Sequence, residues 1–118
     1  MVRPHQSLDV WQQSMRLVKM TYAATQGFPK EEQYGLTAQM RRAAVSIPSN
    51  LAEGSARNSR KEMAQFVGIA KGSLSELETQ MLISTDLGYL PVQHEVFAQL
   101  ERVAQLLSGL YRSVVRRT

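Results

Sequence analysis

The residues of this sequence best suited to chemistry are its cations, which gather in two stretches. Residues 41–71 hold six lysine and arginine residues against two carboxylates, and the last seventeen residues hold four arginines and no carboxylate. In the segment 55–61, cationic side chains stand beside the free backbone N–H groups of an expected helix start, a combination that suits a phosphate. We therefore predict nucleic-acid binding by eight residues: Arg41, Arg42, Arg57, Arg60, Lys61, Arg112, Arg116 and Arg117.

A plainer interpretation of these charges stays open, in which the C-terminal arginines complement a helix dipole and the other cations solubilise the surface. Assembly into a ring would change the balance, because each cluster would be repeated around the axis and would attract a polyanion by counterion release. The chain has only eight aromatic residues, several of them on expected core stripes. Recognition is therefore expected to follow shape and phosphate rather than base sequence.

Other chemistry finds few suitable residues. The absence of cysteine excludes disulfides, thiolate metal sites and cysteine nucleophiles. Neither His5 nor His94 follows a glutamate by three residues, the spacing used in di-metal helical bundles. Phosphate-loop and nucleophile-elbow patterns are also missing from the sequence. We expect no enzymatic activity, no metal and no cofactor.

Length and composition are those of one soluble domain over residues 1–118. Of these residues 43% are hydrophobic and 20% are charged, and the net charge is +4. The N-terminal segment lacks the basic and apolar regions of a signal peptide, and no run of 18 apolar residues occurs. We expect a cytoplasmic protein with no membrane segment.

Three turn signals, at residues 27–29, 54–59 and 88–91, divide the chain into four helical segments. Apolar residues recur at spacings of three and four in each segment, and no strand-like alternation occurs. The predicted core stripes of the last three segments are Leu36, Met40, Ala43, Ala44, Ile47 and Leu51 in the second, Met63, Phe66, Val67, Ala70, Leu74, Leu77 and Met81 in the third, and Val92, Val96, Leu100, Val103, Leu107, Leu110 and Val114 in the fourth. We predict an all-α, antiparallel, up-down-up-down four-helix bundle. The third helix is expected to open at residue 58 or 59 and to end near 87, and the fourth to carry Pro91 in its first turn.

The first helix, expected over residues 7–26, has more apolar surface than one bundle can bury. Its predicted core stripe consists of Leu8, Trp11, Met15, Val18 and Tyr22. A second strip nearly opposite contains further apolar residues, and the third helix also has apolar residues outside its own stripe. Scattered surface residues are the plain alternative to self-association. The predicted oligomer contacts are Val10, Leu17, Met20, Ile69 and Ile83, and Leu17→Glu is expected to leave a helical monomer.

One part of the chain carries a distinctive pattern. It reads YGL at residues 34–36 and QMRRAAVSIPSNLAEG at residues 39–54. This pattern resembles the signature of the four-helix-bundle proteins encoded by intervening sequences of 23S ribosomal RNA genes. Residues 9–11, 66–77 and 87–90 resemble the same family, so the similarity covers most of the chain.

The resemblance implies a subunit of a ring of five bundles. It also implies a relation to the accessory variability protein of diversity-generating retroelements, which works with a reverse transcriptase and nucleic acid. The family has no established activity, and the resemblance assigns no role to any matched residue. The expected partners are other copies of the chain, RNA or DNA, and a protein such as a reverse transcriptase. A protein-interaction scaffold with no nucleic-acid role is the open alternative.

The polar residues of the matched pattern fall on one side of the second helix. They are Arg42, Ser46, Ser49, Asn50 and Glu53. We consider this strip a candidate subunit contact. A partly buried Arg42 would need an acidic partner such as Glu53 or Glu76, and an RNA contact through Arg41 and Arg42 is the competing hypothesis.

Overall fold

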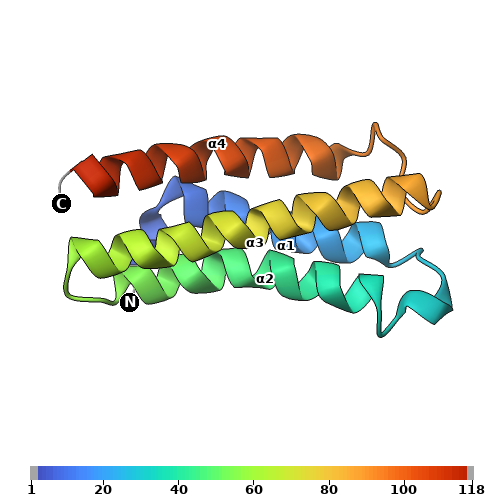
Figure 1. The fold of residues 1–118 in the computed structure, drawn as a ribbon, viewed down its shortest axis with the longest axis horizontal. Coiled ribbons are helices and arrows are strands. Elements are labelled where there is room, and N and C mark those ends of the chain that lie inside the picture. Colours follow the sequence, from blue (N-terminus) through green and yellow to red (C-terminus); the bar gives the residue numbers. More distant parts are fainter. Residues whose placement is uncertain (1–2, 117–118) are drawn as a thin grey trace.

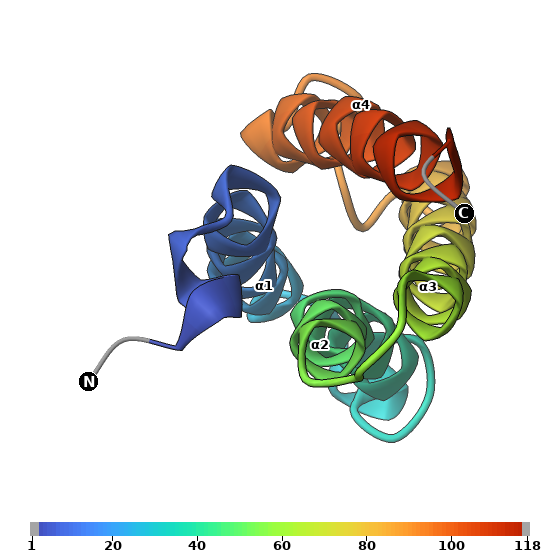
Figure 2. The ribbon, with the colours of Figure 1, turned by 90° about the vertical axis from the view of Figure 1, so that its left-hand side faces the viewer.

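The computed structural model describes residues 3–116, and within this range it contains four long α-helices, two short 3-10 helices and no strand. In chain order the elements are η1 (Pro4–Ser7), α1 (Asp9–Thr25), η2 (Lys30–Glu32), α2 (Leu36–Ser55), α3 (Arg60–Asp86) and α4 (Glu95–Arg116). Successive long helices run in opposite directions (Figure 1). In the described range α1 packs on α2 and α4 but not on α3, as the end-on view shows (Figure 2). The predicted four-helix bundle is confirmed.

Two of the long helices begin with a side-chain cap. The Ser59 hydroxyl accepts the backbone N–H of Glu62 at 3.1 Å and lies 3.2 Å from the carboxylate of the same residue. This cap starts α3 where the sequence predicts it. At the start of α4, the Nδ1 atom of His94 accepts the backbone N–H of Val96 at 3.0 Å. Each cap satisfies one of the N–H groups that a helix start leaves without an intrahelical partner.

The start of α4 differs from the prediction, which placed Pro91 in its first turn. The helix begins at Glu95, and Val92 is 69% exposed instead of belonging to the core. Gly88 adopts a left-handed φ of 83°, and Leu90 is buried. The chain therefore turns at a glycine and inserts one leucine into the core, so the helix can start only after this anchored loop.

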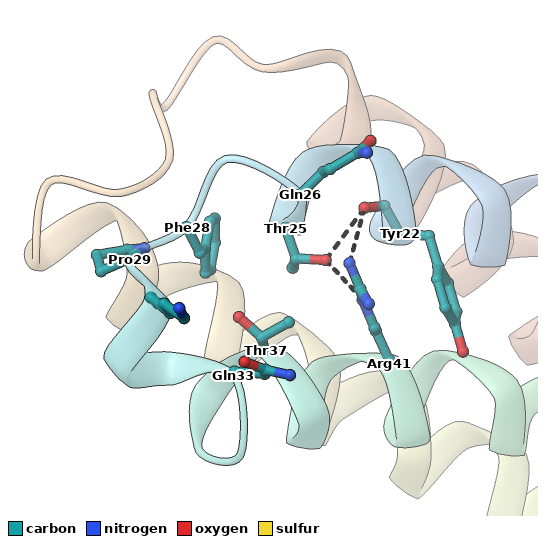
Figure 3. A pocket seen from close by; sticks show the side chains of 9 residues that line it. Tyr22, Thr25, Gln26, Phe28, Pro29, Gln33, Thr37 and Arg41 are labelled. Carbon is teal, nitrogen blue, oxygen red and sulfur yellow. Dashed lines mark hydrogen bonds between the residues drawn. The ribbon is translucent and has the colours of Figure 1, made fainter.

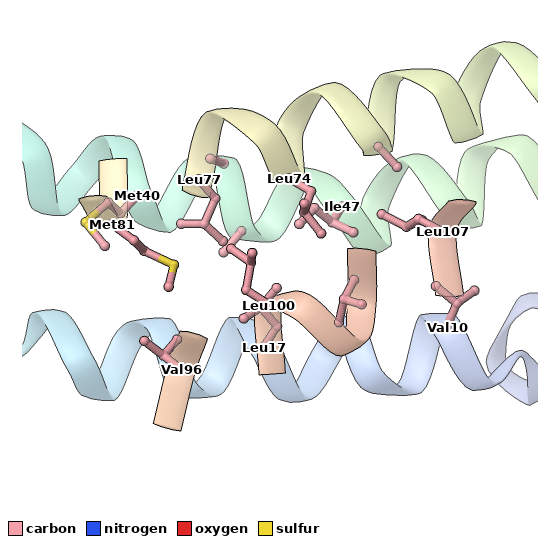
Figure 4. Close-up of a cluster of buried hydrophobic side chains, with 14 of the residues drawn as sticks. Val10, Leu17, Met40, Ile47, Leu74, Leu77, Met81, Val96, Leu100 and Leu107 are labelled. Atoms are coloured by element: carbon pink, nitrogen blue, oxygen red, sulfur yellow. The ribbon is translucent and has the colours of Figure 1, made fainter. Parts of the chain in front are cut away.

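Side chains from all four long helices form one apolar core (Figure 4). The stripes predicted for α2, α3 and α4 supply most of it, apart from Val92. Their large, fully buried members include Met40, Ile47, Leu51, Val67, Leu77, Met81, Val96, Val103 and Leu107. The periodicity of these three helices therefore predicted their buried faces correctly.

The buried face of α1 is not the predicted one. Its buried residues are Val10, Ser14, Leu17, Thr21 and Thr25. Val10 and Leu17 point into the core (Figure 4), where Leu17 has no exposed surface. Their prediction as oligomer contacts is therefore wrong.

The other three predicted contacts have different surroundings. Met20 is partly buried and packs against the core. Ile69 and Ile83 are 51% and 44% exposed. Only these two isoleucines therefore present the open apolar surface that the predicted contacts require.

Hydroxyl side chains explain why the buried face of α1 escaped the hydropathy pattern. Ser14, Thr21 and Thr25 read as polar, yet each donates to the carbonyl oxygen four residues earlier, at 2.6, 2.8 and 2.9 Å. Short side chains whose hydrogen bonds are satisfied within their own helix can be buried at little cost. The larger residues Met15 and Tyr22 are left 40% and 43% exposed on the outer side.

Helices α2 and α3 approach each other closely. The hydroxyls of Ser46 and Ser73 lie 2.8 Å apart, and the Asn50 amide donates to the Ser46 carbonyl at 2.8 Å. At Gly54, an added Cβ would lie 2.9 Å from the Cβ of Phe66, so this position requires glycine. The Ser46 hydroxyl therefore takes part in the packing of α2 on α3, and Asn50 is bonded to Ser46 within α2, while a subunit contact through this strip stays a prediction.

Candidate nucleic-acid interface

The antiparallel packing of α3 and α4 brings two separate groups of cations to one end of the bundle. Helix α3 begins, and α4 ends, at the left-hand side of Figure 1. We call this region the basic end and define it by five residues: Arg57, Arg60, Lys61, Arg112 and Arg116. All five are exposed. Arg117, another of the eight cations predicted to bind nucleic acid, lies outside the described residues.

Arg57 is oriented by two neighbours without being buried. Its guanidinium lies 4.9 Å from the centre of the Phe66 ring, and its Nη2 atom lies 3.7 Å from the Oε2 atom of Glu53. Both charged side chains are about half exposed, so the ion pair contributes little stability and can exchange for a phosphate. Arg60 and Lys61 have no ion pair within residues 3–116.

The start of α3 has fewer free N–H groups to bind a phosphate than the sequence indicates. The N–H group of Glu62 is already bonded to the Ser59 hydroxyl, and the Glu62 carboxylate lies beside that hydroxyl. This carboxylate complements the positive end of the helix dipole, where an anion would otherwise gain from it. The attraction for an anion must therefore come from the cationic side chains.

A shallow hollow of about 390 Å³ lies between η1 and the α2–α3 turn. Its polar lining includes Arg57, Asn58, Ser59 and Arg60, and no carboxylate lines it. Side-chain cations with amide and hydroxyl groups are the usual contacts to a phosphate backbone. The hollow therefore gives the basic end a concave part that suits a phosphate.

Arg41 and Arg42 lie on α2, away from the basic end. The Nε atom of Arg41 donates to the Thr25 hydroxyl at 3.0 Å, and its Nη2 atom donates to the Tyr22 carbonyl at 3.3 Å (Figure 3). Arg41 therefore ties α2 to the end of α1. Arg42 is exposed, and within the described part of the chain it has neither of the acidic partners considered for it, because Glu53 pairs with Arg57.

Carboxylates gather at the opposite end of the bundle. Glu31 and Glu32 belong to η2, Asp86 ends α3 and Glu95 begins α4. The net charge of +4 therefore hides a polarised molecule with one basic and one acidic end. Such a field orients a polyanion towards the basic end.

Neither a metal-ion cluster nor a membrane-spanning helix occurs within residues 3–116. No three histidine, aspartate or glutamate side chains there come close enough to hold a metal ion. No helix in the same range is sufficiently long and apolar to cross a lipid bilayer.

A comparison with models of protein families tests the family resemblance that the pattern in α2 indicates. The model of the 23S rRNA-intervening sequence protein family matches residues 6–109. The chain belongs to this family. A comparison with curated proteins finds no match. In this 23S rRNA-intervening sequence protein, the matched region contains Arg57, Arg60 and Lys61, whereas Arg112 and Arg116 follow it.

Proposed function

We propose that this 23S rRNA-intervening sequence protein is a non-enzymatic homo-oligomer that binds RNA or DNA through the basic end without sequence preference. The observation that carries the proposal is the meeting of two cation groups, from the α2–α3 turn and from the end of α4, at one end of the bundle. Affinity for a polyanion rises with the number of phosphates that such cations neutralise.

The surroundings of these cations support binding without base recognition. Phe66 lies beneath the Arg57 guanidinium, and Trp11 packs edge-on against His5 with ring centres 5.3 Å apart. These aromatic rings are engaged with neighbouring side chains instead of offering free stacking surfaces. Contacts to phosphates position a nucleic acid, whereas contacts to bases read its sequence.

Two apolar surfaces on opposite sides of the bundle support assembly. One is the α1 outer strip, defined by Met15, which is 40% exposed, and by its neighbours Trp11 and Val18, which are half-buried and pack partly against the core. The other comprises Ile69 and Ile83 on α3. Helices α1 and α3 do not touch within the described chain. The α1 surface of one copy could therefore contact the α3 surface of the next copy, so that two different patches meet. Such heterologous contacts form a ring when the rotation between neighbouring copies closes, and the family resemblance implies a ring of five subunits.

The test replaces Arg57, Arg60 and Lys61 together by serine. In fluorescence anisotropy titrations with single- and double-stranded RNA and DNA, we expect affinity at low salt to fall about tenfold or more. The plot of log affinity against log salt has a negative slope, and the magnitude of this slope should decrease by about 2 to 3 because three phosphate contacts are lost.

The control variant removes the same three charges elsewhere, by changing Arg16, Lys19 and Arg102 to serine. These residues are exposed on α1 and α4 and lie outside the basic end. We expect this variant to bind nearly as the native protein does. Equal losses in both variants, or no binding of any nucleic acid by the native protein at low salt, would exclude the basic end as the interface.

A protein-interaction scaffold is the second candidate function. Val92 is 69% exposed in the loop between α3 and α4, and Leu87 is 54% exposed one helical turn after Ile83. Exposed apolar side chains of this kind suit a protein partner, and the resemblance suggests a reverse transcriptase. A triple serine variant with an unaltered binding curve would favour this candidate.

A further inference from the structure

Two adjoining pockets lie on the outer surface of α1 and α2, near η2. Their volumes are about 620 and 710 Å³, and four residues line both of them: Tyr22, Gln33, Thr37 and Arg41. The pockets therefore form one continuous depression, the first part of which is shown in Figure 3. We call them the η2 pockets. Volumes of this size suit a small organic ligand.

Arg41 lies at the junction of the two pockets with most of its donors unused. Its guanidinium is 4.5 Å from the centre of the Tyr22 ring and makes two hydrogen bonds, to Thr25 and to the Tyr22 carbonyl. A guanidinium has five N–H donors, so three remain for a ligand. Within residues 3–116 no carboxylate pairs with it. A half-buried cation without an acidic partner gains strongly from a bound anion.

Thr37 supplies a second polar group without a partner. It is only 8% exposed, it lines both pockets, and its hydroxyl makes no hydrogen bond within the described chain. Figure 3 shows its side chain directed into the first pocket, between Gln33 and Arg41. Lys30 lines this pocket as well. Because the Thr37 hydroxyl is free to donate to a ligand in the pocket, Thr37 and the two cations point to an anion such as a phosphate.

Glu31 and Glu32 lie in η2, near the pockets, and the Glu32 carboxylate is held by other partners. The Oε1 atom of Glu32 accepts the backbone N–H of Leu36 at 3.2 Å, and its Oε2 atom accepts the Tyr89 hydroxyl at 3.1 Å. Neither Glu31 nor Glu32 lines either of the η2 pockets. The cations therefore face the ligand position without a lining carboxylate.

The second pocket adds a flat apolar surface next to the cations. Tyr34 is 87% exposed and lines this pocket together with Ala38 and Val45, whereas one face of the Tyr22 ring is already covered by the Arg41 guanidinium. Exposed aromatic rings stack on nucleobases whatever the base. An anion and an apolar ring system joined in one molecule would fill both parts of the depression.

We propose that the η2 pockets bind one nucleotide, with its phosphate on Arg41, Lys30 and Thr37 and its base against Tyr34. A free nucleotide and a single unit of a nucleic-acid strand present the same phosphate and base. The inference does not rest on the basic end, since none of the residues that line the η2 pockets belongs to it.

Calorimetric titration of the full chain with AMP, adenosine and inorganic phosphate tests the ligand class. We expect AMP to bind with a Kd below about 1 mM and each of its halves to bind at least about tenfold more weakly. Absence of saturable AMP binding overturns the proposal. Adenosine or phosphate that binds as tightly as AMP overturns it too, because the pocket would then recognise only a base or a bare anion.

Variants test the residues. Arg41→Gln should weaken AMP binding about tenfold or more, whereas Arg102→Gln, which removes the same charge at an exposed position of α4 outside both proposed sites, should change it less than about twofold. Because Arg41 also ties α1 to α2, Thr37→Val provides a second measurement. It removes the free hydroxyl but keeps the shape, and should weaken AMP binding at least about threefold. Unchanged affinity in Thr37→Val, or in a folded Arg41→Gln variant, overturns the proposal.

The triple serine variant of the basic end separates the two sources of the ligand. If AMP and a trinucleotide bind this variant equally tightly, the ligand of the η2 pockets is a free nucleotide. If the trinucleotide binds about tenfold more tightly than AMP, the ligand is one unit of a nucleic-acid strand. AMP binding in this variant should equal that of the native chain. If the native chain binds AMP but no nucleic acid, the proposed function fails and this inference stands. If the native chain binds nucleic acid through the basic end but does not bind AMP, only this inference fails.

Discussion

At the scale of single residues, hydroxyl and guanidinium groups decide local features that a hydropathy pattern does not record. Thr25 illustrates this, since its hydroxyl donates to the Thr21 carbonyl at 2.9 Å and accepts from Arg41 at 3.0 Å. One short side chain thereby fills a core position and anchors a cation from another helix. The absence of a nearby carboxylate around Arg41 and Arg42 was the one sequence signal that could have indicated an anion site, whereas nothing marked Thr37 as part of it.

Tyr89 gives a prediction at this scale. Its hydroxyl donates to the Oε2 atom of Glu32 at 3.1 Å, which joins the α3–α4 loop to η2. Burial raises the pKa of Tyr89 above its ordinary value of 10.0, and the hydrogen bond and negative charge of Glu32 and the charge of Glu31 raise it further. The stabilisation is therefore fully present below the ordinary pKa and is lost as the pH rises through the raised one.

Urea unfolding between neutral pH and about pH 11 checks this prediction. The free energy of unfolding of the native chain should fall more steeply above pH 10.0 than that of Tyr89→Phe. Tyr34→Phe is the matched control, because Tyr34 is 87% exposed, and it should follow the native chain. Parallel curves for the native chain and Tyr89→Phe would show that the Glu32 contact has no effect on stability.

At the scale of elements, α1 is the helix for which the sequence could not show which of two apolar faces is buried. Both faces carry apolar side chains at helical spacing, and the structure buries the one with smaller residues and hydroxyls. Smaller side chains let α1 lie closer to its neighbours, so more backbone and side-chain surface is buried together. In the proposed assembly, the α1 outer strip, with Met15 at its centre, takes the place of Val10 and Leu17, which are buried.

Leu17→Glu gives the prediction for α1. Leu17 has no exposed surface, so the new carboxylate would be buried without a partner. We expect the free energy of unfolding to fall by about 4 kcal/mol or more, which is a large fraction of the stability of a domain this size. Circular dichroism during urea unfolding measures this loss.

The control for this prediction is Lys19→Glu, which places the same side chain at an exposed position on α1. Its stability should change by less than about 0.5 kcal/mol. A Leu17→Glu chain with native stability would mean that the predicted outer position of Leu17 was right and the observed core wrong.

At the scale of the whole molecule, the bundle separates charge along its length and apolar surface across it. Cations gather at one end and carboxylates at the other, while α1 and α3 present apolar residues on opposite sides. In a ring whose axis runs along the bundles, all basic ends would share one face. The summed field of that face would exceed that of one subunit.

Met15→Glu tests this assembly. Met15 is 40% exposed, so a charge there should leave the helices folded and break the contact between copies. Light scattering should find an oligomer for the native chain and a particle of about 13.3 kDa for the variant. Ala98→Glu, an exposed change on α4, should keep the native mass. A native chain that is already a monomer, or a Met15→Glu oligomer of unchanged mass, would rule out the α1 outer strip.

The sequence by itself determined the four-helix bundle, the start of α3 and the buried faces of α2, α3 and α4. These features depend on local patterns, because a 3.6-residue periodicity and a Ser59 cap act within a few turns of one helix. It also placed cations at 55–61 and near the C-terminus, but as two unconnected groups.

Only the tertiary structure decided which face of α1 is buried, that Ser46 takes part in the packing of α2 on α3, and that the two cation groups meet. Each of these depends on which residues distant in the sequence come within hydrogen-bonding or packing distance. Hydroxyls such as Ser14 can be buried only because bonds within their helix satisfy them while other helices cover them. Such contacts form when the helices pack, so no local pattern contains them.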